Sequence, residues 1–283
     1  MTGFDLSTAQ GIYIGDQLAS AVYLGNNLIW TGTHDYSQDY LTFEAIENTT
    51  FKLIWASNTL QYSIDGGSTW TTLAADTASP TVTAGNKIMW KQTGLTPARY
   101  VGIGTFSSTG NYKAYGNIMS LYYGDNFVGQ TNLTGKNYAF YGLFYNNKLV
   151  DASNLILPAT TLAEHCYEYM FYGCTSLTTA PELPATTLAQ SCYYYMFHSC
   201  TSLTTAPELL VTTLIQSCYY GMFQGCTSLN YIKCLATNIS ATSCTAYWVN
   251  NVAATGTFVK ADSMSSWNTG TNGIPSGWTV QNV

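Results

Sequence analysis

Charged side chains are scarce in this chain of 283 residues, where they make up 8% of the sequence, against about 25% in ordinary globular proteins. The nine Lys and Arg residues do not cluster, and the net charge is −6. Nucleic acid and anionic membrane surfaces are bound by clustered cations. We therefore expect neither as a partner, and solubility has to come from hydroxyl and amide groups.

Long hydrophobic runs are missing as well. No segment approaches about 18 uninterrupted apolar residues, so the sequence predicts no membrane span. The N-terminal stretch, MTGFDLSTAQGIYIG, has neither a basic nor an apolar region typical of a secretory signal. We therefore do not expect this N-terminus to direct the chain through a secretion system.

Histidine is rare, with three copies in the chain, and no nucleophile elbow, phosphate-binding loop or paired metal-ligand motif occurs. His34 lies in an apparent linker, whereas His165 and His198 occupy different places in a repeat and so do not form a shared metal site. Glu182 and Glu208 recur one repeat apart and are interpreted as solvated charge, not as a catalytic pair. The sequence therefore predicts a protein that is not an enzyme and needs no cofactor or metal.

The chain does contain a repeat with a period of 26 residues. Residues 157–182, 183–208 and 209–234 align without a gap, as LPATTLAEHCYEYMFYGCTSLTTAPE, LPATTLAQSCYYYMFHSCTSLTTAPE and LLVTTLIQSCYYGMFQGCTSLNYIKC. In a repeat of this length, each copy is one supersecondary unit whose apolar side is buried only against its neighbours. The sequence therefore predicts a solenoid.

Six positions are constant in the three copies and are expected to face inward. They are Leu162, Leu188 and Leu214; Cys166, Cys192 and Cys218; Met170, Met196 and Met222; Phe171, Phe197 and Phe223; Cys174, Cys200 and Cys226; and Leu177, Leu203 and Leu229. The first three positions lie four residues apart, which predicts one stripe of a short helix. The next segment, LTTAPEL, predicts a short edge-type strand that ends near Pro181 or Pro207.

These constant residues resemble the BspA-type (Treponema-type) bacterial leucine-rich repeat, whose units carry a similar Phe, two residues, Cys, two residues, Leu core. A degenerate copy at residues 138–158 has Asn147 near the Cys position, and an atypical copy has Cys244 one period after Cys218. Irregular first and last units are typical of solenoid caps. We therefore assign residues 117–283 to a leucine-rich-repeat solenoid with caps.

All eight cysteines lie at or after residue 166, and seven of them form two series with the period of the repeat. Buried thiols stacked in ladders are the favoured interpretation, because free Cys is among the most buried residue types. Disulfides are the alternative. No pair of cysteines has the short spacing of a zinc knuckle, which argues against a metal site.

The first part of the chain contains a second, shorter repeat. Its two copies are IYIGDQL at residues 12–18 and VYLGNNL at residues 22–28. Each is an alternating strand broken by a turn dipeptide, Gly15-Asp16 or Gly25-Asn26. So short a unit has no core of its own. We interpret residues 1–32 as a β-hairpin attachment module that packs on other parts of the protein or on other subunits.

Residues 33–116 carry alternating runs separated by Gly, Asn, Asp and Pro, which predict a β-sandwich. The whole chain is thus expected to combine β domains with an α/β solenoid. Within the sandwich, SIDGGSTW at residues 63–70 matches the Asp-box pattern of sialidases and other sugar-active proteins. We favour a structural turn in which Asp65 bonds backbone N–H groups and Trp70 packs. Sialidases that resemble this pattern hold the carboxylate of their substrate with three Arg, and this chain has only Arg99. A ligand site is the alternative.

Positions that vary between the copies are expected to be exposed, and several of them carry tyrosine, which binding surfaces favour. The alternative is that these rings only cover the coil, as expected for the invariant Tyr167, Tyr193 and Tyr219. The candidate ligand-binding residues are Tyr169, Tyr172, Tyr194, Tyr195, His198, Tyr220 and Gln224.

The whole layout resembles structural and fibre proteins of gut Bacteroidales phages, including crAss-like phages. The resemblance lies in the IYIGDQL and VYLGNNLIW units and in the flanks of the repeat, residues 102–127 and 255–280. The resemblance implies a setting and not a ligand. The leading hypothesis is a virion fibre or receptor-binding protein that attaches through its N-terminus to other virion proteins, forms a homo-oligomer with a trimer favoured, and presents the repeat to a host glycan or protein. The alternatives are a bacterial cell-surface adhesin and a capsid decoration or head-fibre protein without a ligand.

Overall fold

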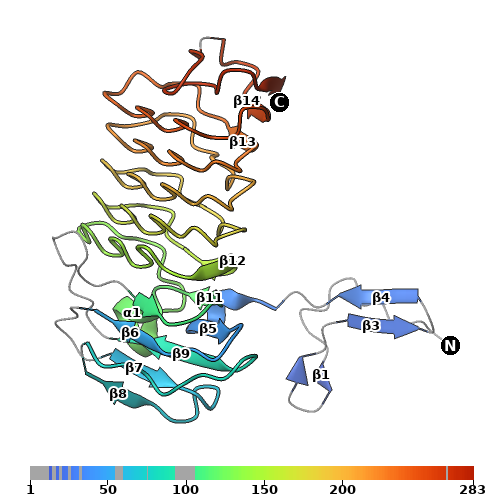
Figure 1. The fold of residues 1–283 in the computed structure, drawn as a ribbon, viewed down its shortest axis with the longest axis vertical. Coiled ribbons are helices and arrows are strands. Elements are labelled where there is room, and N and C mark those ends of the chain that lie inside the picture. Colours follow the sequence, from blue (N-terminus) through green and yellow to red (C-terminus); the bar gives the residue numbers. More distant parts are fainter. Residues whose placement is uncertain are drawn as a thin grey trace.

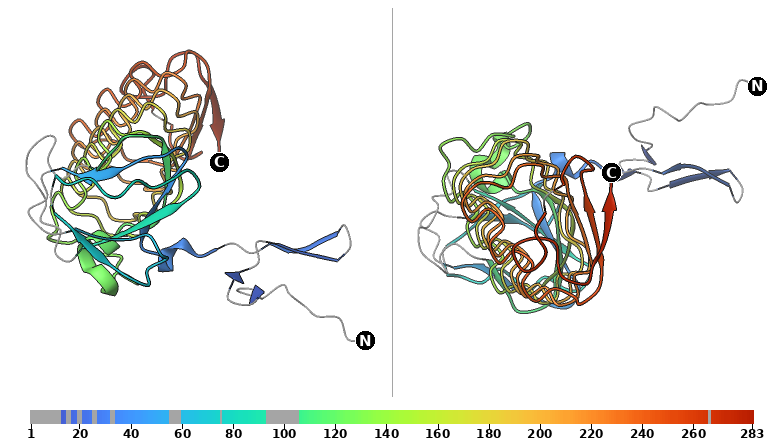
Figure 2. Two further views of the ribbon diagram at one scale, coloured as in Figure 1. Left: turned by 60° about the horizontal axis from the view of Figure 1, so that its bottom comes forward. Right: turned by 90° about the horizontal axis from the view of Figure 1, so that it is seen from above.

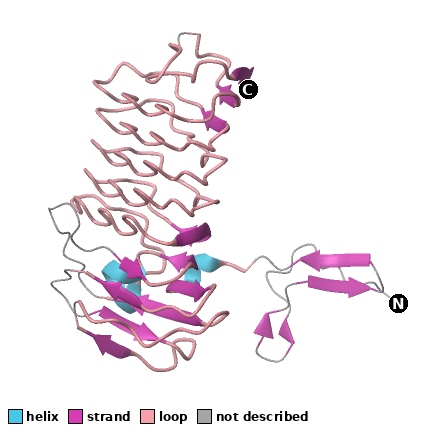
Figure 3. Ribbon diagram, in the orientation of Figure 1, coloured by secondary structure: helices cyan, strands magenta, loops and turns pink. Residues whose placement is uncertain are grey.

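The structure is a computed structural model. It describes residues 34–54, 60–74, 76–92, 106–265 and 267–283, together with the backbone of four short strands near the N-terminus. The protein is rich in β structure, with several open sheets. In the described ranges the helical elements are one short α-helix, α1 (Ser120–Tyr123), and two 3-10 turns, η1 (Tyr36–Gln38) and η2 (Gly124–Asn126) (Figure 3).

The N-terminal strands form two antiparallel hairpins, drawn to one side of the main body in Figure 1. β1 (Tyr13–Ile14) pairs with β2 (Gln17–Leu18), and β3 (Ala21–Leu24) pairs with β4 (Asn27–Thr31). The innermost pairs, Ile14 with Gln17 and Leu24 with Asn27, each leave a two-residue connection. The two predicted hairpins are therefore confirmed, and their turn residues lie outside the described part of the chain.

Two packed sheets follow. The larger has the strand order β12-β11-β5-β9-β7-β8, and the smaller consists of β10 and β6. The bounds are β5 (Leu41–Ala45), β6 (Phe51–Leu53), β7 (Leu60–Ser63), β8 (Thr71–Leu73), β9 (Lys87–Lys91), β10 (Phe106–Ser108), β11 (Tyr112–Asn117) and β12 (Leu149–Ile156). All pairs within the two sheets are antiparallel except β11 with β12.

Aromatic rings join the two sheets. Between ring centroids, Phe43 of β5 lies 5.1 Å from Phe51 and 5.0 Å from Phe106. Trp90 of β9, the strand next to β5 in the larger sheet, lies 5.2 Å from Phe106. All four residues are almost completely buried. These rings meet at angles of 49° to 84°, because they come from strands with unrelated sequences.

Beyond β11 the chain winds into coils that stack one upon the next (Figure 2). Within each coil, every second residue of one half donates its backbone N–H to the next coil. In the coil that begins at residue 157, the donors and acceptors are His165 to Gln190 (3.1 Å), Tyr167 to Cys192 (3.0 Å), Tyr169 to Tyr194 (2.9 Å), Phe171 to Met196 (2.8 Å) and Gly173 to His198 (2.8 Å). The same pattern recurs one coil later.

The short helix predicted for this half of the coil is wrong. The residues between those donors, such as Cys166, Met170 and Cys174, give their N–H to the carbonyl three residues earlier, at 3.1 to 3.3 Å. An α-helix would bond to the residue four positions earlier, whereas a bond over three residues closes a turn. The segment is therefore a string of consecutive turns, and we call it the turn half of the coil.

Positive φ angles explain why no helix forms. They recur every four residues, at His165 (58°), Tyr169 (55°) and Gly173 (70°), and at the equivalent positions of the other coils. This backbone conformation is incompatible with a right-handed helix. The four-residue spacing of Cys166, Met170 and Cys174 nevertheless keeps all three side chains buried, because the string of turns also places every fourth residue on the same side.

The other half of each coil was predicted to be a short strand, and only part of it is. Thr179 and Thr205 form isolated parallel bridges, to Asp151 and Tyr231 respectively. Pro181 and Pro207 follow closely, and proline has no N–H for a sheet. Where the proline-containing sequence gives way to YIKC, regular strands appear, namely β13 (Tyr231–Cys234), β14 (Thr257–Lys260) and β15 (Thr279–Asn282), which pair in parallel.

A column of phenylalanine rings runs through the stack. Successive centroids lie 5.4 Å apart between Phe144 and Phe171, 5.2 Å between Phe171 and Phe197, and 5.7 Å between Phe197 and Phe223, with interplanar angles of 14° or less. Phe106 of β10 extends the column, since it lies 6.4 Å from Phe144 at 20°. The core of the two sheets and the core of the stack are therefore continuous.

All eight cysteines are buried free thiols in this structure. Three of them donate to a phenylalanine carbonyl one coil earlier, with Sγ to O distances of 2.9 Å from Cys174 to Phe144, 3.1 Å from Cys200 to Phe171 and 3.0 Å from Cys226 to Phe197. Asn147 continues this ladder, because its Nδ2 donates to the carbonyl of Phe106 at 2.5 Å. Asn147 thus takes the Cys position, as the degenerate first copy predicted.

The far end of the stack is closed by tryptophans. Trp248 stacks on Trp267 at 5.5 Å and donates its Nε1–H to the carbonyl of Gly273 at 2.8 Å. Cys244 is buried, as expected for the atypical last copy. In the described part of the chain, no helix is long and apolar enough to cross a membrane.

Candidate functional site

The variable positions of the coils bring aromatic rings together on the outside of the turn half. We call this group the aromatic array. It consists of Tyr141, Tyr145, Tyr169, Tyr172, Tyr194, Tyr195, His198, Tyr220 and Tyr247. Six of the seven predicted site residues belong to it, and the seventh, Gln224, lies one coil after His198 in the same column.

The first column of the array consists of nearly parallel rings. The Tyr172 ring lies between Tyr145, 4.7 Å away at 5°, and His198, 4.4 Å away at 2°. Gln224 follows in the next coil, and its buried Oε1 accepts no hydrogen bond from any residue that the structure describes. His198 is half-buried, and desolvation lowers its pKa, so this imidazole is neutral near pH 7.

The second column is interrupted by a glycine. Tyr169 and Tyr195 stack at 5.6 Å and 10°, but the equivalent residue of the next coil is Gly221. A Cβ atom at Gly221 would overlap the Tyr195 ring. The glycine therefore leaves room for Tyr195, whose ring also packs at a steep angle against Tyr220.

The third column contains Tyr194 and Tyr220, stacked at 4.7 Å and 15°. In the preceding coil the same position is Glu168, a buried carboxylate whose pKa is raised by desolvation. Its Oε2 makes a short hydrogen bond with Nδ1 of His165, which stacks on Tyr138 at 4.6 Å. This His and Glu are thus tied to each other at the edge of the array.

The predicted tyrosines are half-buried and not fully exposed. The reason is that each ring is covered by the ring of the adjacent coil. Burial raises the pKa of Tyr195 to about 12 and also raises the pKa of Tyr169 and Tyr194. Their hydroxyl groups are therefore protonated at neutral pH. The invariant Tyr167, Tyr193 and Tyr219 are completely buried, which confirms their structural role.

Sequence reasoning missed three members of the array. Tyr141 and Tyr145 belong to the degenerate first copy, and Tyr247 belongs to the atypical last one. An offset of 27 residues, which aligns Asn147 with Cys174, also aligns Tyr145 with Tyr172 and would have identified it. Tyr247 lies one 26-residue period after Gly221 and is the most exposed of the nine, at 49%.

The Asp-box is a hydrogen-bonded turn between β7 and β8. Asp65 accepts hydrogen bonds from the backbone N–H of Thr69 (2.9 Å), the hydroxyl of Thr69 (2.6 Å) and the hydroxyl of Ser63 (2.7 Å), and these bonds lower its pKa to about 2. Trp70 packs against Tyr40 at 4.8 Å and under the Lys91 ammonium at 4.2 Å. The structural interpretation of the motif accounts for these contacts.

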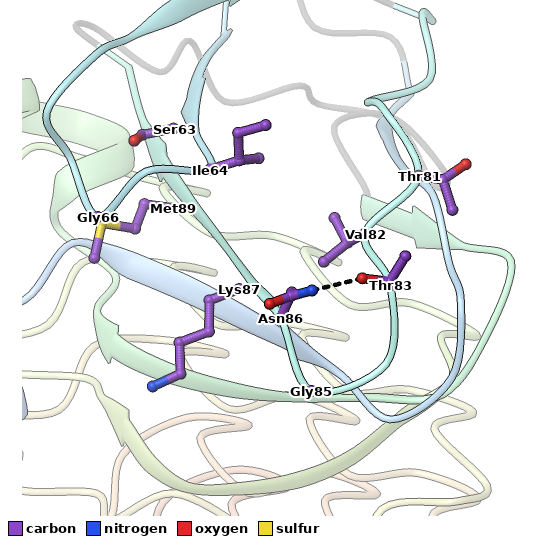
Figure 4. A pocket seen from close by; sticks show the side chains of 10 residues that line it. All are labelled: Ser63, Ile64, Gly66, Thr81, Val82, Thr83, Gly85, Asn86, Lys87 and Met89. Carbon is purple, nitrogen blue, oxygen red and sulfur yellow. Dashed lines mark hydrogen bonds between the residues drawn. The ribbon is translucent and has the colours of Figure 1, made fainter.

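A cavity of about 470 Å³ opens beside this turn, between residues 63–66 and 81–89 (Figure 4). Its ten lining residues include one charged side chain, Lys87, and no carboxylate or histidine. Lys87 lies 3.9 Å from Glu44 and 4.9 Å from the centre of the Tyr115 ring. The cavity therefore has no pair of acid and base groups and no free cation for a carboxylate ligand.

Metal-ligating side chains do not converge in the described ranges, where no group of three His, Cys, Asp or Glu could hold an ion.

Comparison of the chain with protein-family models, with characterised proteins and with solved structures finds no match.

Proposed function

We propose that this protein is a non-enzymatic virion fibre or receptor-binding protein that presents the outer surface of its coils to a glycan or protein on a host cell. In this proposal the coils are a leucine-rich-repeat solenoid of 26-residue period, the two sheets are a β-sandwich, and the hairpins are an attachment module. The observation that carries the proposal is the aromatic array, which occupies the variable positions of an otherwise constant repeat.

Several properties of the array suit recognition. Tyrosine offers a large, stiff contact area at low entropic cost, and the stacking holds each ring in one orientation before a partner arrives. Such preorganisation reduces the cost of binding. The array spans the coils from Tyr145 to Tyr247, so a partner would meet residues from several repeats at once.

The N-terminal hairpins support attachment as their role. A pair of two-stranded hairpins is marginally stable in isolation, and unpaired strand edges are ready to pair with other chains. The resemblance to phage structural proteins supplies the setting, with other virion proteins and further copies of this chain, most simply three, as partners. A bacterial adhesin that uses the same surface is the second candidate, because the repeat also resembles BspA-type proteins.

Adsorption to host cells tests the proposal. The variant Tyr169→Gly, Tyr172→Gln, Tyr195→Gly places in two coils the residues that Gly221 and Gln224 provide in the third, so the backbone tolerates them. We expect it to lose adsorption to gut Bacteroidales cells. The control Thr178→Gln, Thr204→Gln changes exposed residues on the other half of the coils and should adsorb like the unchanged protein.

Equal adsorption by the array variant and the control would refute recognition through the array. Localisation of the chain in purified particles, and its mass in solution, separate the candidates. A trimer found in virions favours the fibre, whereas a monomer on bacterial cells favours the adhesin.

A further inference from the structure

The ring faces in the aromatic array are largely used by the array itself. Both faces of Tyr172 are covered, by Tyr145 and His198, and Tyr194 and Tyr220 cover one another. A ligand that stacks a flat ring or a sugar on an aromatic side chain needs a free face. These positions offer ring edges and hydroxyl groups instead.

The hydroxyl groups are available to a partner. Those of Tyr169, Tyr172 and Tyr194 make no hydrogen bond to any residue that the structure describes, and their oxygens are not among the buried polar atoms. A protonated phenol provides one donor and also accepts hydrogen bonds. Because stacked rings fix the positions of these three groups, little side-chain freedom is lost when they bind.

The exposed charge beside the array is negative. Residues 149–232 contain no Lys or Arg. Of their five carboxylates, Glu164 and Glu168 lie on the turn half, whereas Asp151, Glu182 and Glu208 lie on the other half, where Glu208 pairs with Lys233 at 2.9 Å. Glu164 is exposed near the array, where it accepts a hydrogen bond from Asn137 at 3.2 Å. Opposite charge speeds encounter and discriminates between partners, so this region favours a partner that carries cations.

We infer that the aromatic array binds a protein surface that carries Lys or Arg together with backbone or amide groups, and that it does so through its tyrosine hydroxyl groups. This inference rests on the proposed function and narrows its ligand from a glycan or protein to a protein. Hydrogen bonds to fixed hydroxyls supply specificity, and the exposed carboxylate of Glu164 supplies attraction that salt screens.

Replacement of three tyrosines by phenylalanine tests the hydroxyl groups without loss of the rings. The variant Tyr169→Phe, Tyr172→Phe, Tyr194→Phe keeps the stacking, so its melting temperature should match that of the unchanged protein. Labelled protein is titrated onto intact gut Bacteroidales cells that are untreated, treated with proteinase or treated with periodate. We expect the variant to bind untreated cells at least tenfold more weakly, and proteinase, but not periodate, to abolish binding of the unchanged protein.

Tyr231→Phe is the matched control, because it removes one phenol hydroxyl from a half-buried tyrosine of β13, outside the array. We expect the Tyr231→Phe variant to retain binding, and we expect binding of the unchanged protein to weaken as salt is raised. Loss of binding after periodate would instead establish recognition of a sugar and overturn the inference.

The outcomes separate the inference from the proposed function. Binding that survives the three Tyr→Phe changes but is lost in the Gly and Gln variant of the array would keep the surface and overturn the hydroxyl mode. Binding that survives both sets of changes would overturn both. Failure of the unchanged protein to bind untreated cells would also overturn both.

Discussion

The two sheets and the stacked coils bury similar aromatic residues in different ways. Among the sheets, Phe43 meets Phe51 at 49° and Phe106 at 84°, and the three residues come from three different strands. Among the coils, Phe171 and Phe197 are parallel within 1°, because a repeat presents the same side chain at the same place in each turn. The comparison teaches that a stack is built from one contact repeated, whereas a sheet core needs many different ones.

The largest difference between the two regions should appear at alkaline pH. All eight cysteines lie in the stack, and burial raises the pKa of Cys166, Cys174, Cys218, Cys226 and Cys234 from 9.0 to about 12. A raised pKa means that the folded state retains protons that the unfolded state loses. Stability is therefore intact below pH 9 and falls between pH 9 and 12, by about 1.4 kcal/mol per unit for each such thiol.

Five thiols of this kind are enough to unfold a domain of ordinary stability of about 5–15 kcal/mol within two pH units. Hydrogen exchange at pH 8, 10 and 11, corrected for the intrinsic rate, should show loss of protection in residues 157–243 before residues 41–53. Simultaneous loss of protection would show that the two regions do not differ in this respect. Thiol labelling without reductant should reach eight sites only after denaturation.

The second prediction concerns the junction at Phe106. Its N–H donates to the Leu143 carbonyl at 2.8 Å, its own carbonyl accepts from Asn147, and its ring stacks on Phe144. Phe106→Ala should cost about 3–5 kcal/mol of unfolding free energy and should separate one cooperative transition into two. Calorimetry measures both effects.

Phe223→Ala is the control for the junction, because it leaves a similar cavity near the far end of the column. It should lower the stability of the stack alone. A Phe106→Ala protein that still unfolds in one transition would mean that the continuous core does not depend on this residue.

Two glycines with similar backbone angles test the role of stacking. Gly221 of the stack (φ 58°) lies against the Tyr195 ring, whereas Gly66 of the Asp-box turn (φ 73°) has open space around it. Gly66→Ala should cost about 1 kcal/mol, from the backbone conformation alone. Gly221→Ala should cost about 1–3 kcal/mol more, measured by urea denaturation, because the ring has to move. Equal costs would contradict a close fit between the coils.

The smallest effect concerns the thiol ladder. Cys200→Ala removes the hydrogen bond from Sγ to the Phe171 carbonyl, which also accepts the N–H of Cys174. We expect a loss of about 1 kcal/mol, and we expect Cys200→Ser, which keeps a donor, to be the more stable of the two in urea denaturation. If the alanine variant is the more stable, the thiol acts only as a small apolar side chain.

Much of the molecule could be read from local patterns. The hairpin strands, the alternating strands of the sheets and the buried series of Leu, Cys, Met and Phe follow from periodicity, which depends only on which residues lie on one side of a segment. Asp65 and Trp70 were also predictable, since a turn motif is stabilised by its own residues. The aromatic array was predicted in part, from positions that vary in an otherwise constant repeat.

The sequence by itself determined the period and the inward side chains, because these depend on the order of residues along one coil. Tertiary structure alone decided that Cys166, Met170 and Cys174 lie on a string of turns and not on a helix. Both structures place every fourth residue on one side, and the choice depends on N–H groups that bond to the next coil. The stack also decided that Tyr172 shows its edge and not its face, because a ring is covered only when the coils before and after it are in place.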